Sequence, residues 1–434
     1  MSRVSAAFVV ILGVLTAQAA EAQRPTGNVS VFTDYFPNRH DTVELRTRLF
    51  VEEKLDTKMR SDTRAIVTAS GFVEGLVSRR FVAGQDAGLQ VVRDAIARVQ
   101  DANIEVLGSR IDLLAGYARI VWGRLDEIQP TDVINPLDVS KFFFEGRSEA
   151  RLPMLVGRVR VHLSERLNVE GVYLPDFRRA HFDQLDEPTS PFNLPVLAAQ
   201  DPTAISVSDR QPAFTASNAQ GGVRISATSG RVDWSVSAFR GLETFGVYTS
   251  ERSSTVPPVA PSVSIDYPRF SMVGGDFEAV RGTWGMRGEV AAFVADNFQS
   301  ADLRVVTGQS FDAGFGVDRR AGDYTLSGTV LLHSESYDAP LTISQAGDTL
   351  DGRTDVSFIV SADRTFARER YRFRGFGVYN ASDASVFVRG IWMASLRDNL
   401  AIEGSIGWFA GDSLDLIGRF GDSDFAYLKL KYYF

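Results

Sequence analysis

Stretches of the chain alternate apolar and polar side chains with a period of two, from near residue 43 to the last residue. Successive side chains of a β-strand point to opposite faces, so each stretch has one apolar and one polar face. A strand that crosses a membrane in a barrel needs this pattern over about 9–11 residues, with its apolar face toward lipid. The clearest stretches are 43–52, 155–164, 284–294, 324–333, 371–379 and 425–434. The pattern predicts an all-β transmembrane barrel.

The connections between these stretches fit the same architecture, because membrane barrels have short periplasmic turns and long outer loops. Tight turns are predicted at Ser229-Gly230, Arg281-Gly282 and Asp398-Asn399, and longer connections at 251–262, 336–352 and 410–422. We expect a single antiparallel barrel of about 16 strands, within a range of about 14 to 18, and an even number because both chain ends face the periplasm. A short helical or loop segment is predicted after about the fifth strand, and a long loop at 176–218.

The first residues have the organisation of a secretory signal peptide. Arg3 gives a basic start, an apolar core follows, and two small-residue cleavage patterns end at Ala19 and Ala22. The core of about a dozen residues is too short to cross a bilayer as a helix, which argues against a retained anchor. We expect cleavage after Ala22, with Ala19 as the alternative. The expected domains are a signal peptide at 1–22 and a barrel at 23–434.

Composition narrows the class further. The 434 residues include no cysteine, so no disulfide holds the fold, and the formal net charge of −8 argues against a nucleic-acid partner. Beyond the N-terminal segment, no run of about 18 apolar residues predicts a transmembrane helix. The length would allow about two or three soluble domains, but the strand pattern continues without a linker. One large barrel is the simpler interpretation.

The closing strand carries an export signal. Leu430, Tyr432 and Phe434 share one face, whereas Lys429 and Lys431 share the other. A terminal aromatic residue that ends an alternating strand resembles the signal that the barrel assembly machinery reads. The resemblance implies the outer membrane of a Gram-negative bacterium, with outer-membrane lipids around the barrel. The five tryptophans (Trp122, Trp234, Trp284, Trp392 and Trp408) fall within or at the ends of predicted strands and are expected to form interfacial girdles.

One segment carries more than alternation. It holds Trp122-Gly123, an acidic spacer with Asp126 and Glu127, and then Asp132, Asn135, Pro136 and Asp138. The pattern W-G, spacer, D-x-x-N-P-x-D over about residues 100–176 resembles an uncharacterised family of large Gram-negative outer-membrane barrels. The resemblance implies a structured segment inside the barrel or at its rim. It also associates the chain with traffic of hydrophobic or lipid-like compounds.

The same segment has a purely structural interpretation. Pro136 favours an extended or turn conformation at Asn135. Asp132 and Asp138 can accept hydrogen bonds from nearby backbone amides, and Asp138 could cap a short helix over 139–145. The segment would then be a rigid loop folded into the barrel. A direct contact with a transported substrate is the alternative, and a constriction loop would combine both.

Charges on the predicted inner face suggest a channel lining. The candidates for the lining or constriction are Arg46, Arg48, Arg158, Arg160, Arg372, Arg374, Glu44 and Glu289. Opposed basic and acidic ladders create a transverse field that orients polar solutes. The alternative is that these charges pair across strands and fill a closed interior. At the start of the 176–218 loop, Arg178, Arg179, His181, Asp183 and Asp186 are candidates for the mouth.

Catalysis and metal binding find little support. His162 and Ser164 have the i, i+2 spacing that some barrel phospholipases use, but those enzymes need the pair on the lipid face, and the register places it in the lumen. No His or Cys cluster has metal-ligand spacing. Asp412, Asp415, Asp422 and Asp424 are interpreted as solvated loop acids. We expect no enzyme activity, no cofactor and no metal.

The favoured function is a passive channel or conduit for small polar or amphiphilic molecules. A closed or laterally opening barrel that transfers lipids with a periplasmic partner is the first alternative, and it requires a lateral opening or an apolar lumen patch. A structural or adhesion barrel is the second, and it requires a lumen closed by paired charges. The sequence predicts neither the transported substrate nor the oligomeric state.

Overall fold

The computed structural model describes most of the chain. It covers residues 25–38, 42–60, 62–82, 88–139, 145–181, 206–251, 262–344, 346–412, 415 and 417–434. The predicted signal peptide, most of the predicted 139–145 helix, Asp183 and Asp186 lie outside these residues. Among the described residues, no helix is both long enough and apolar enough to span a membrane.

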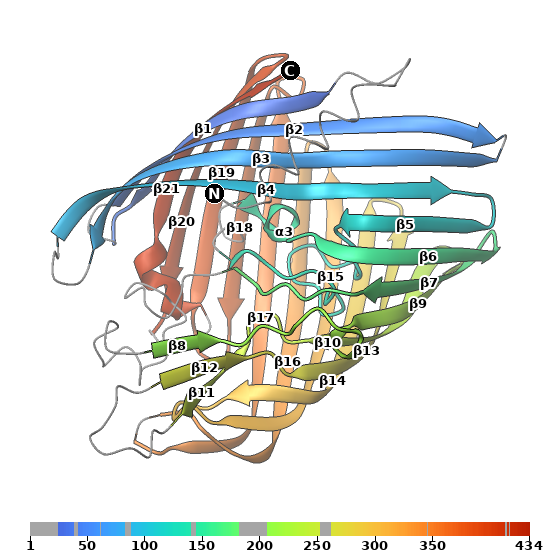
Figure 1. Cartoon of the computed structure of the whole chain (residues 1–434). Helices are drawn as coiled ribbons and strands as arrows, with labels where there is room; N and C mark the ends of the chain where they lie inside the picture. The colour runs from blue at the N-terminus through green and yellow to red at the C-terminus, as the bar shows by residue number, and fades with distance from the viewer. Residues whose placement is uncertain are drawn as a thin grey trace.

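The described strands form one closed antiparallel barrel (Figure 1). In chain order they are β1 (Thr26–Phe36), β2 (Thr42–Arg60), β3 (Thr63–Val82), β4 (Gly88–Leu107), β5 (Ile111–Ala118), β6 (Met154–Ser164), β7 (Leu167–Leu174), β9 (Gln220–Ser229), β10 (Val232–Leu242), β13 (Arg269–Arg281), β14 (Trp284–Gln299), β15 (Val305–Ala321), β16 (Tyr324–Thr342), β17 (Thr349–Phe366), β18 (Tyr371–Asn380), β19 (Val386–Arg397), β20 (Leu400–Ala410) and β21 (Phe425–Tyr433). Each pairs with its neighbour, and β21 pairs with β1 to close the ring. The barrel has 18 strands. The expected all-β barrel is confirmed, and its strand number lies at the upper end of the predicted range.

The two faces of the strands differ as the alternation predicts. On β2, Val43, Leu45 and Leu49 are 40–45% exposed, which places them on the outer surface. Their neighbours Arg46 and Arg48 point inward and form ion pairs there. A closed barrel with an apolar outer face satisfies its backbone hydrogen bonds internally, which is how β-proteins cross the outer membrane.

The predicted short turns are confirmed, and one predicted loop is wrong. Gly230 and Gly282 lie in the turns β9–β10 and β13–β14 with φ of 66° and 64°, a conformation that glycine adopts at low cost. The 336–352 segment, however, is mostly strand, because β16 runs to Thr342 and β17 begins at Thr349. Strand residues beyond the hydrocarbon layer need no apolar face. The alternation of apolar and polar residues therefore stops there, although the backbone hydrogen bonds between the strands continue.

A small second sheet escaped the sequence analysis. Its strands are β8 (Ser206–Asp209), β11 (Val247–Glu251) and β12 (Ser262–Asp266), with β12 in the centre. β8 belongs to the long 176–218 loop, and the other two form a hairpin between β10 and β13. Strands of four or five residues are too short to show a reliable period.

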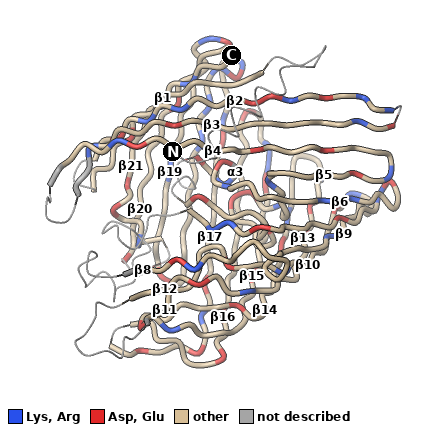
Figure 2. Tube along the Cα trace, viewed as in Figure 1, with Lys and Arg blue, Asp and Glu red and all other residues tan. Residues whose placement is uncertain are grey.

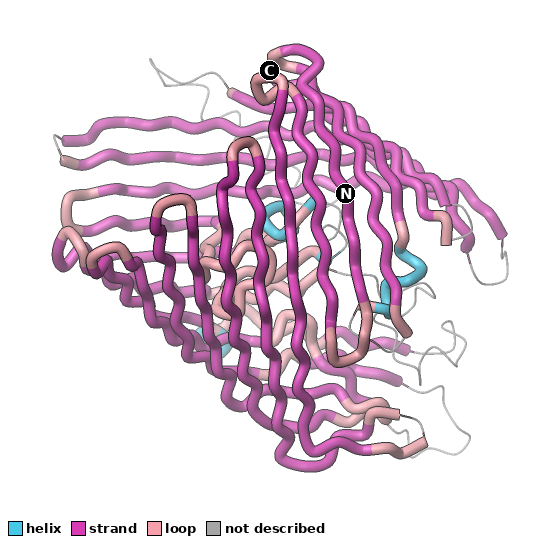
Figure 3. Tube along the Cα trace, turned by 180° about the vertical axis from the view of Figure 1, so that it is seen from behind, coloured by secondary structure: helices cyan, strands magenta, loops and turns pink. Residues whose placement is uncertain are grey.

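The wall is incomplete next to β4. This strand pairs with β3 along its whole length, from Gly88 to Leu107. Its pairing with β5, by contrast, runs only from Ala102 to Val106. Within the described part of the chain, no strand pairs with the β5-facing edge of β4 over 88–101. The chain turns inward after β5 instead of continuing the wall (Figure 3).

Candidate functional site: an inward loop and the channel beside it

The described residues between β5 and β6, 119–139 and 145–153, fold into the barrel; we call them the inward loop. It includes the short helix α3 (Arg147–Ala150). Its residues Ile120, Trp122 and Ile134 belong to a buried cluster with inner-face side chains of β5, β6, β7, β10, β13 and β14. The expected segment after the fifth strand is therefore present and lies inside the ring of strands.

Trp122 holds the start of the inward loop against the wall. Its side chain is 1% exposed, its Nε1 donates to Glu170 Oε1 at 2.8 Å, and its ring meets Phe239 edge-on at 6.2 Å. Glu170 also pairs with Arg160 at 2.6 Å. The expectation that Trp122 ends a strand and joins an interfacial girdle is wrong, because β5 ends at Ala118 and the loop carries the indole inward. An indole pointing inward looks the same in sequence as one at the headgroup level.

Glu289 fixes the middle of the inward loop. Its carboxylate accepts hydrogen bonds from the backbone amides of Arg124, Leu125 and Thr131 at 3.0, 3.2 and 2.7 Å. The Thr131 hydroxyl donates a fourth at 2.6 Å. Glu289 is 2% exposed and projects from β14. One buried carboxylate thus satisfies three loop amides that no secondary structure pairs.

The N-P motif is an internal clasp. The amide of Asn135 donates to Leu152 O at 2.8 Å, and its Oδ1 accepts from the Ile120 amide at 2.8 Å, so it joins both ends of the loop. Pro136 O accepts from the Leu152 amide at 2.8 Å. These contacts agree with the rigid-loop interpretation.

The two aspartates of the motif bind arginines. Asp132 accepts from Arg147 at 3.1 Å and Arg151 at 2.8 Å, both of which are downstream in the same loop. Asp138 pairs with Arg98 of β4 at 2.6 Å and with His181 at 3.2 Å. The proposed backbone-amide role of Asp132 is thus replaced by ion pairs, because two guanidinium groups lie within reach in the folded loop.

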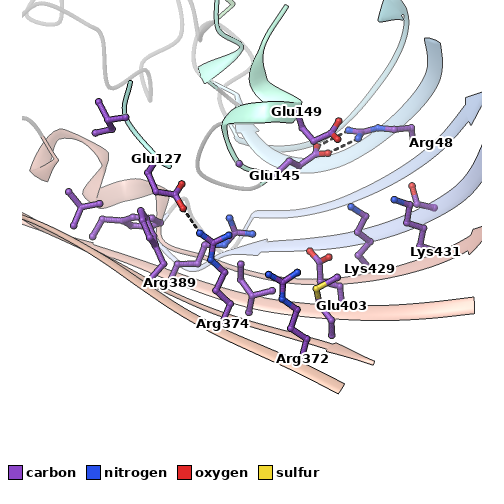
Figure 4. Close-up of a pocket in the computed structure, with 18 of the residues that line it drawn as sticks. Arg48, Glu127, Glu145, Glu149, Arg372, Arg374, Arg389, Glu403, Lys429 and Lys431 are labelled. Carbon is purple, nitrogen blue, oxygen red and sulfur yellow. Dashed lines mark hydrogen bonds and ion pairs between the residues drawn. The ribbon is translucent and has the colours of Figure 1, made fainter. Parts of the chain in front are cut away.

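A cavity of about 530 Å³ lies between the inward loop and the opposite wall, which β1–β3 and β17–β21 form. Six basic side chains line it: Arg48, Arg372, Arg374, Arg389, Lys429 and Lys431. Four acidic side chains, Glu127, Glu145, Glu149 and Glu403, also line it. Figure 4 shows these groups projecting into one space from the loop and from the wall. Basic and acidic positions are interspersed along the same strands elsewhere in the barrel (Figure 2).

Ion pairs at two points tie the inward loop to this opposite wall. Glu127 pairs with Arg374 of β18, and Glu145 pairs with Arg48 at 2.6 Å and with Arg46 at 3.7 Å, both on β2. Lys429 projects into the same space from the wall, below the Glu145–Arg48 pair in the view of Figure 4. The loop is therefore held at both sides of the cavity, which stays open between them.

The basic groups of the cavity differ in how far they are neutralised. Arg48 binds both Glu74 and Glu145, and Arg372 pairs with Asp363 at 2.7 Å. Neither Lys429 nor Lys431 forms a salt bridge within the described residues; instead, their Nζ atoms lie 4.5 Å from the Phe32 ring and 4.9 Å from the Tyr433 ring. The two lysines thus differ from Arg48, Arg372 and Arg374, each of which pairs with a carboxylate.

A second cavity, of about 1030 Å³, lies at the other side of the inward loop near the β4–β5 and β6–β7 turns. Arg160, His162, Ser164 and Glu170 line it. His162 Nε2 lies 2.9 Å from Asp112 Oδ2, and its Nδ1 lies 2.5 Å from Asn168 Oδ1. The His162 and Ser164 side chains thus face the interior, so the requirement of the phospholipase alternative for a lipid-facing pair is not met.

The other predicted lining residues also point inward. Arg46 binds Asp34 through two nitrogens at 2.7 and 3.0 Å, Arg158 pairs with Glu105, and Glu44 accepts from Ser78 at 3.1 Å. They extend the lining but do not border the 530 Å³ cavity beside Lys429. Of the predicted eight, the structure gathers Arg48, Arg372 and Arg374 around the 530 Å³ cavity. A role in permeation remains a prediction for all eight.

The predicted mouth residues connect loops to each other. Arg178 donates to Pro153 O at 2.8 Å, Arg179 pairs with Asp209 at 2.8 Å, and His181 forms a bridge with Asp138. Burial and the nearby Arg98 lower the pKa of Arg178 to about 10, so it stays charged at neutral pH. None of these three lines either cavity.

The sequence analysis missed the part of the lining that the loop supplies. Glu145 and Glu149 lie in a segment without alternation, so the sequence does not predict whether their side chains point inward or outward. Arg389 and Lys429, by contrast, follow directly after apolar strand residues, so alternation does predict that they point inward. Their neighbours Val388 and Leu428 are 47% and 51% exposed on the outer face.

The expectation that the protein binds no metal stays a prediction. Among the described residues, no group of His, Cys, Asp or Glu side chains is arranged to hold a metal ion. Asp424 accepts instead from the Phe409 amide at 2.7 Å and from Asn38 at 2.9 Å, and Asp415 accepts from the Asp412 amide at 2.5 Å.

Comparison with known proteins places the chain in a family. A family model described as "Protein of unknown function (DUF1302)" matches residues 38–315. The chain belongs to this family. A search of curated proteins returned no match.

Solved structures with the same fold include proteins of two Pseudomonas species. OccK7 (OpdD) of Pseudomonas aeruginosa has a TM-score of 0.50 at 11% identity, over 96% of this chain and 99% of that one. OccK5 (OpdH) of the same organism has a TM-score of 0.50 at 10% identity, over 94% and 96%. A BenF-like porin from Pseudomonas fluorescens Pf-5 has 0.49 at 11%, over 96% and 98%. At these identities the similarity shows the barrel fold, which the DUF1302 chain shares along nearly its whole length.

Proposed function

We propose that this protein is a passive channel of the outer membrane, narrowed by the inward loop. The observation that carries the proposal is the 530 Å³ cavity between the inward loop and the wall of β1–β3 and β17–β21. Charged side chains of both signs line it. A barrel of about 18 strands is wide enough for an aqueous lumen. A loop bonded to one wall and ion-paired at two points to the other sets a defined width. The fold shared with a BenF-like porin supports the same function.

The absence of cysteine makes the proposal directly testable. Lys431 lines the cavity, whereas its neighbour Leu430 is 43% exposed on the outer face. We expect Lys431→Cys channels in a planar bilayer to lose a substantial part of their current after a bulky, water-soluble thiol reagent is added. Leu430→Cys is the matched control and should conduct unchanged after the same treatment. Channels of both variants that respond equally, or a folded protein without any conductance, would overturn the proposal.

A second candidate is a barrel that exchanges amphiphiles laterally with the membrane. The observation that favours it is the β4 edge over 88–101, which has no strand partner on the β5 side among the described residues. Gln100 lies on this edge and lines the cavity. An opening here would connect the cavity to the acyl chains, as the lipid-transfer alternative requires. A periplasmic partner would belong to this function.

Fluorescence quenching separates the two candidates. A fluorophore on Gln100→Cys in nanodiscs that contain brominated phospholipids would be quenched if acyl chains reach the cavity. The same fluorophore on Leu430→Cys, which faces lipid, gives the positive control. If the Gln100 probe is not quenched while the Leu430 probe is, lateral exchange with the membrane is ruled out and the aqueous channel remains.

The interior of the barrel does not support the adhesion alternative. It requires a lumen closed by paired charges, and the cavity remains open although most of its arginines are paired. We also propose that the terminal aromatic residue, Phe434, directs assembly of the barrel.

A further inference from the structure

The lining of the 530 Å³ cavity changes character along the barrel axis. On β18, the inner positions read Arg372, Arg374, Phe376 and Val378 from the turn end to the loop end of the strand. β21, which runs in the opposite direction, reads Phe425, Tyr427, Lys429 and Lys431 from the loop end to the turn end. Both strands are thus basic toward the periplasmic turns and apolar or aromatic toward the outer loops.

The apolar part forms a continuous surface. We call Ile359, Phe376, Val378, Phe387, Ile417 and Phe420 the apolar patch; all six line the cavity. Phe387 stacks on Phe409 at 4.3 Å, and Ile417 packs from the last outer loop onto the same cluster. Inner faces of water-filled barrels are polar, so an apolar patch of this size is not what passage of ions alone requires.

The inward loop presents an apolar side chain across the same space. Ile128 is 37% exposed and lines the cavity next to Glu127, which pairs with Arg374. An exposed isoleucine at the tip of an otherwise charged segment fits a solute with an apolar body. Apolar side chains from both the wall and the loop therefore line the cavity.

The basic part lies at a fixed distance from this patch. Strands rise about 3.4 Å per residue, so Phe376 lies about 7 Å from Arg374 and about 14 Å from Arg372 along β18. Cross-strand pairing puts Arg372, Met393, Glu403 and Lys429 on one row. Lys429 is the member of this row that has a positive charge and no salt bridge within the described residues.

We infer that the cavity binds organic anions with an apolar body, such as cyclic or medium-length aliphatic carboxylates. The acidic head lies at Lys429, and the body extends toward the apolar patch and Ile128. Successive inner positions of a strand lie about 7 Å apart, so a body of one ring reaches from Lys429 to the next inner position toward the outer loops. This inference rests on the proposed channel, for which it names the class of solute.

Binding to the full-length protein in nanodiscs tests the inference without relying on conduction. The probes are cyclohexanecarboxylate, acetate, which has only the head, and cyclohexylmethanol, which has only the body. Equilibrium dialysis against empty nanodiscs corrects for partition into lipid. We expect the carboxylate with the ring to bind at least about tenfold more tightly than either partial probe. Equal binding of cyclohexanecarboxylate and acetate would overturn the inference.

Three variants assign the two ends. Lys429→Gln should weaken binding of cyclohexanecarboxylate about tenfold and leave cyclohexylmethanol unchanged. Val378→Asn should weaken both. Ile128→Asn, at an exposed site outside the core, repeats the second test if Val378→Asn folds poorly. Lys58→Gln, on the exposed end of β2, is the control for net charge and should bind like the wild type.

Conductance of the same preparations separates the two proposals. A protein that conducts but does not prefer the ring-bearing carboxylate overturns this inference and leaves the channel. Selective binding without conductance supports the site and overturns the passive channel.

Discussion

At the scale of single residues, buried polar side chains do most of the positioning inside this barrel. Glu289 holds three loop amides and one hydroxyl, and Trp122 donates to Glu170. Each is nearly without solvent exposure. A buried donor that loses its acceptor costs about 1–3 kcal/mol, so replacing Glu289 affects several groups together.

We therefore predict that Glu289→Ala loosens the inward loop and leaves the barrel folded. Single-channel records should show a larger mean current and more open-channel noise than the wild type, while heat-modifiable mobility on gels is retained. Glu105→Gln is the control, because Glu105 is a lumenal carboxylate that pairs with Arg158 and not with the loop. Unchanged noise in Glu289→Ala would show that other contacts suffice to hold the loop.

Glu243, in the connection after β10, gives a pH-dependent prediction. Burial, and then the carboxylate of Asp296, raise the pKa of Glu243 to about 8. A carboxyl whose pKa is higher in the folded than in the unfolded state makes stability fall as the pH rises between the two values. From about pH 5 to 8, the wild type should thus lose thermal stability relative to Glu243→Gln. Melting curves in detergent at several pH values measure this, and parallel curves would contradict it.

At the scale of elements, the inward loop and the closing strand depend on different signals. The loop is closed by Asn135, which bonds to residues near both of its ends. The closing strand β21 pairs with β1, and Phe434 exchanges two backbone hydrogen bonds of 3.1 Å with Gly27. Phe434, Tyr432 and Leu430 are 43–51% exposed on the outer face, where an assembly factor can reach them before insertion.

Phe434→Ala should separate assembly from stability. In cells, we expect several-fold less folded barrel in the outer membrane, because the terminal aromatic signal is lost. Refolding of the purified variant into detergent should reach nearly the wild-type yield, since only one side chain at the barrel end is removed. Equal losses in both experiments would assign Phe434 a structural role only.

At the scale of the whole molecule, closure of the barrel by β1 and β21 fixes the topology. The start of β1 and the end of β21 lie on the side of the short turns, and the long connections lie on the opposite side. An even number of strands requires this arrangement. The prediction for an outer-membrane orientation is that the turns face the periplasm.

Epitope insertions measure this orientation. A tag between Ser382 and Asp383, in the β18–β19 loop, should bind antibody on intact cells. A tag between Arg368 and Glu369, in the β17–β18 turn, should bind only after the outer membrane is permeabilised. Each insertion controls for the other, and the reverse pattern would invert the topology.

The sequence by itself determined the class of fold. Alternation with period two is a local property, so strands such as 43–52 and 371–379 were recognisable, as were the inner faces that carry Arg48 and Arg374. Turn residues such as Gly230 also act locally through φ. Alternation weakens where a strand leaves the membrane. For this reason the sequence predicts about 16 strands where the structure has 18, and a loop at 336–352 where it has mostly strand.

Only the tertiary structure decided what the interior does. Trp122, Glu145 and Ile128 lie on a loop whose direction depends on contacts more than a hundred residues away, such as those of Glu289 and Arg374. The same holds for the apolar patch, which joins β17, β18 and β19 with the last outer loop. The sequence fixes which face of each strand points inward through local geometry. Which inward side chains meet around one cavity depends on the closure of the ring and on the packing of the loop within it.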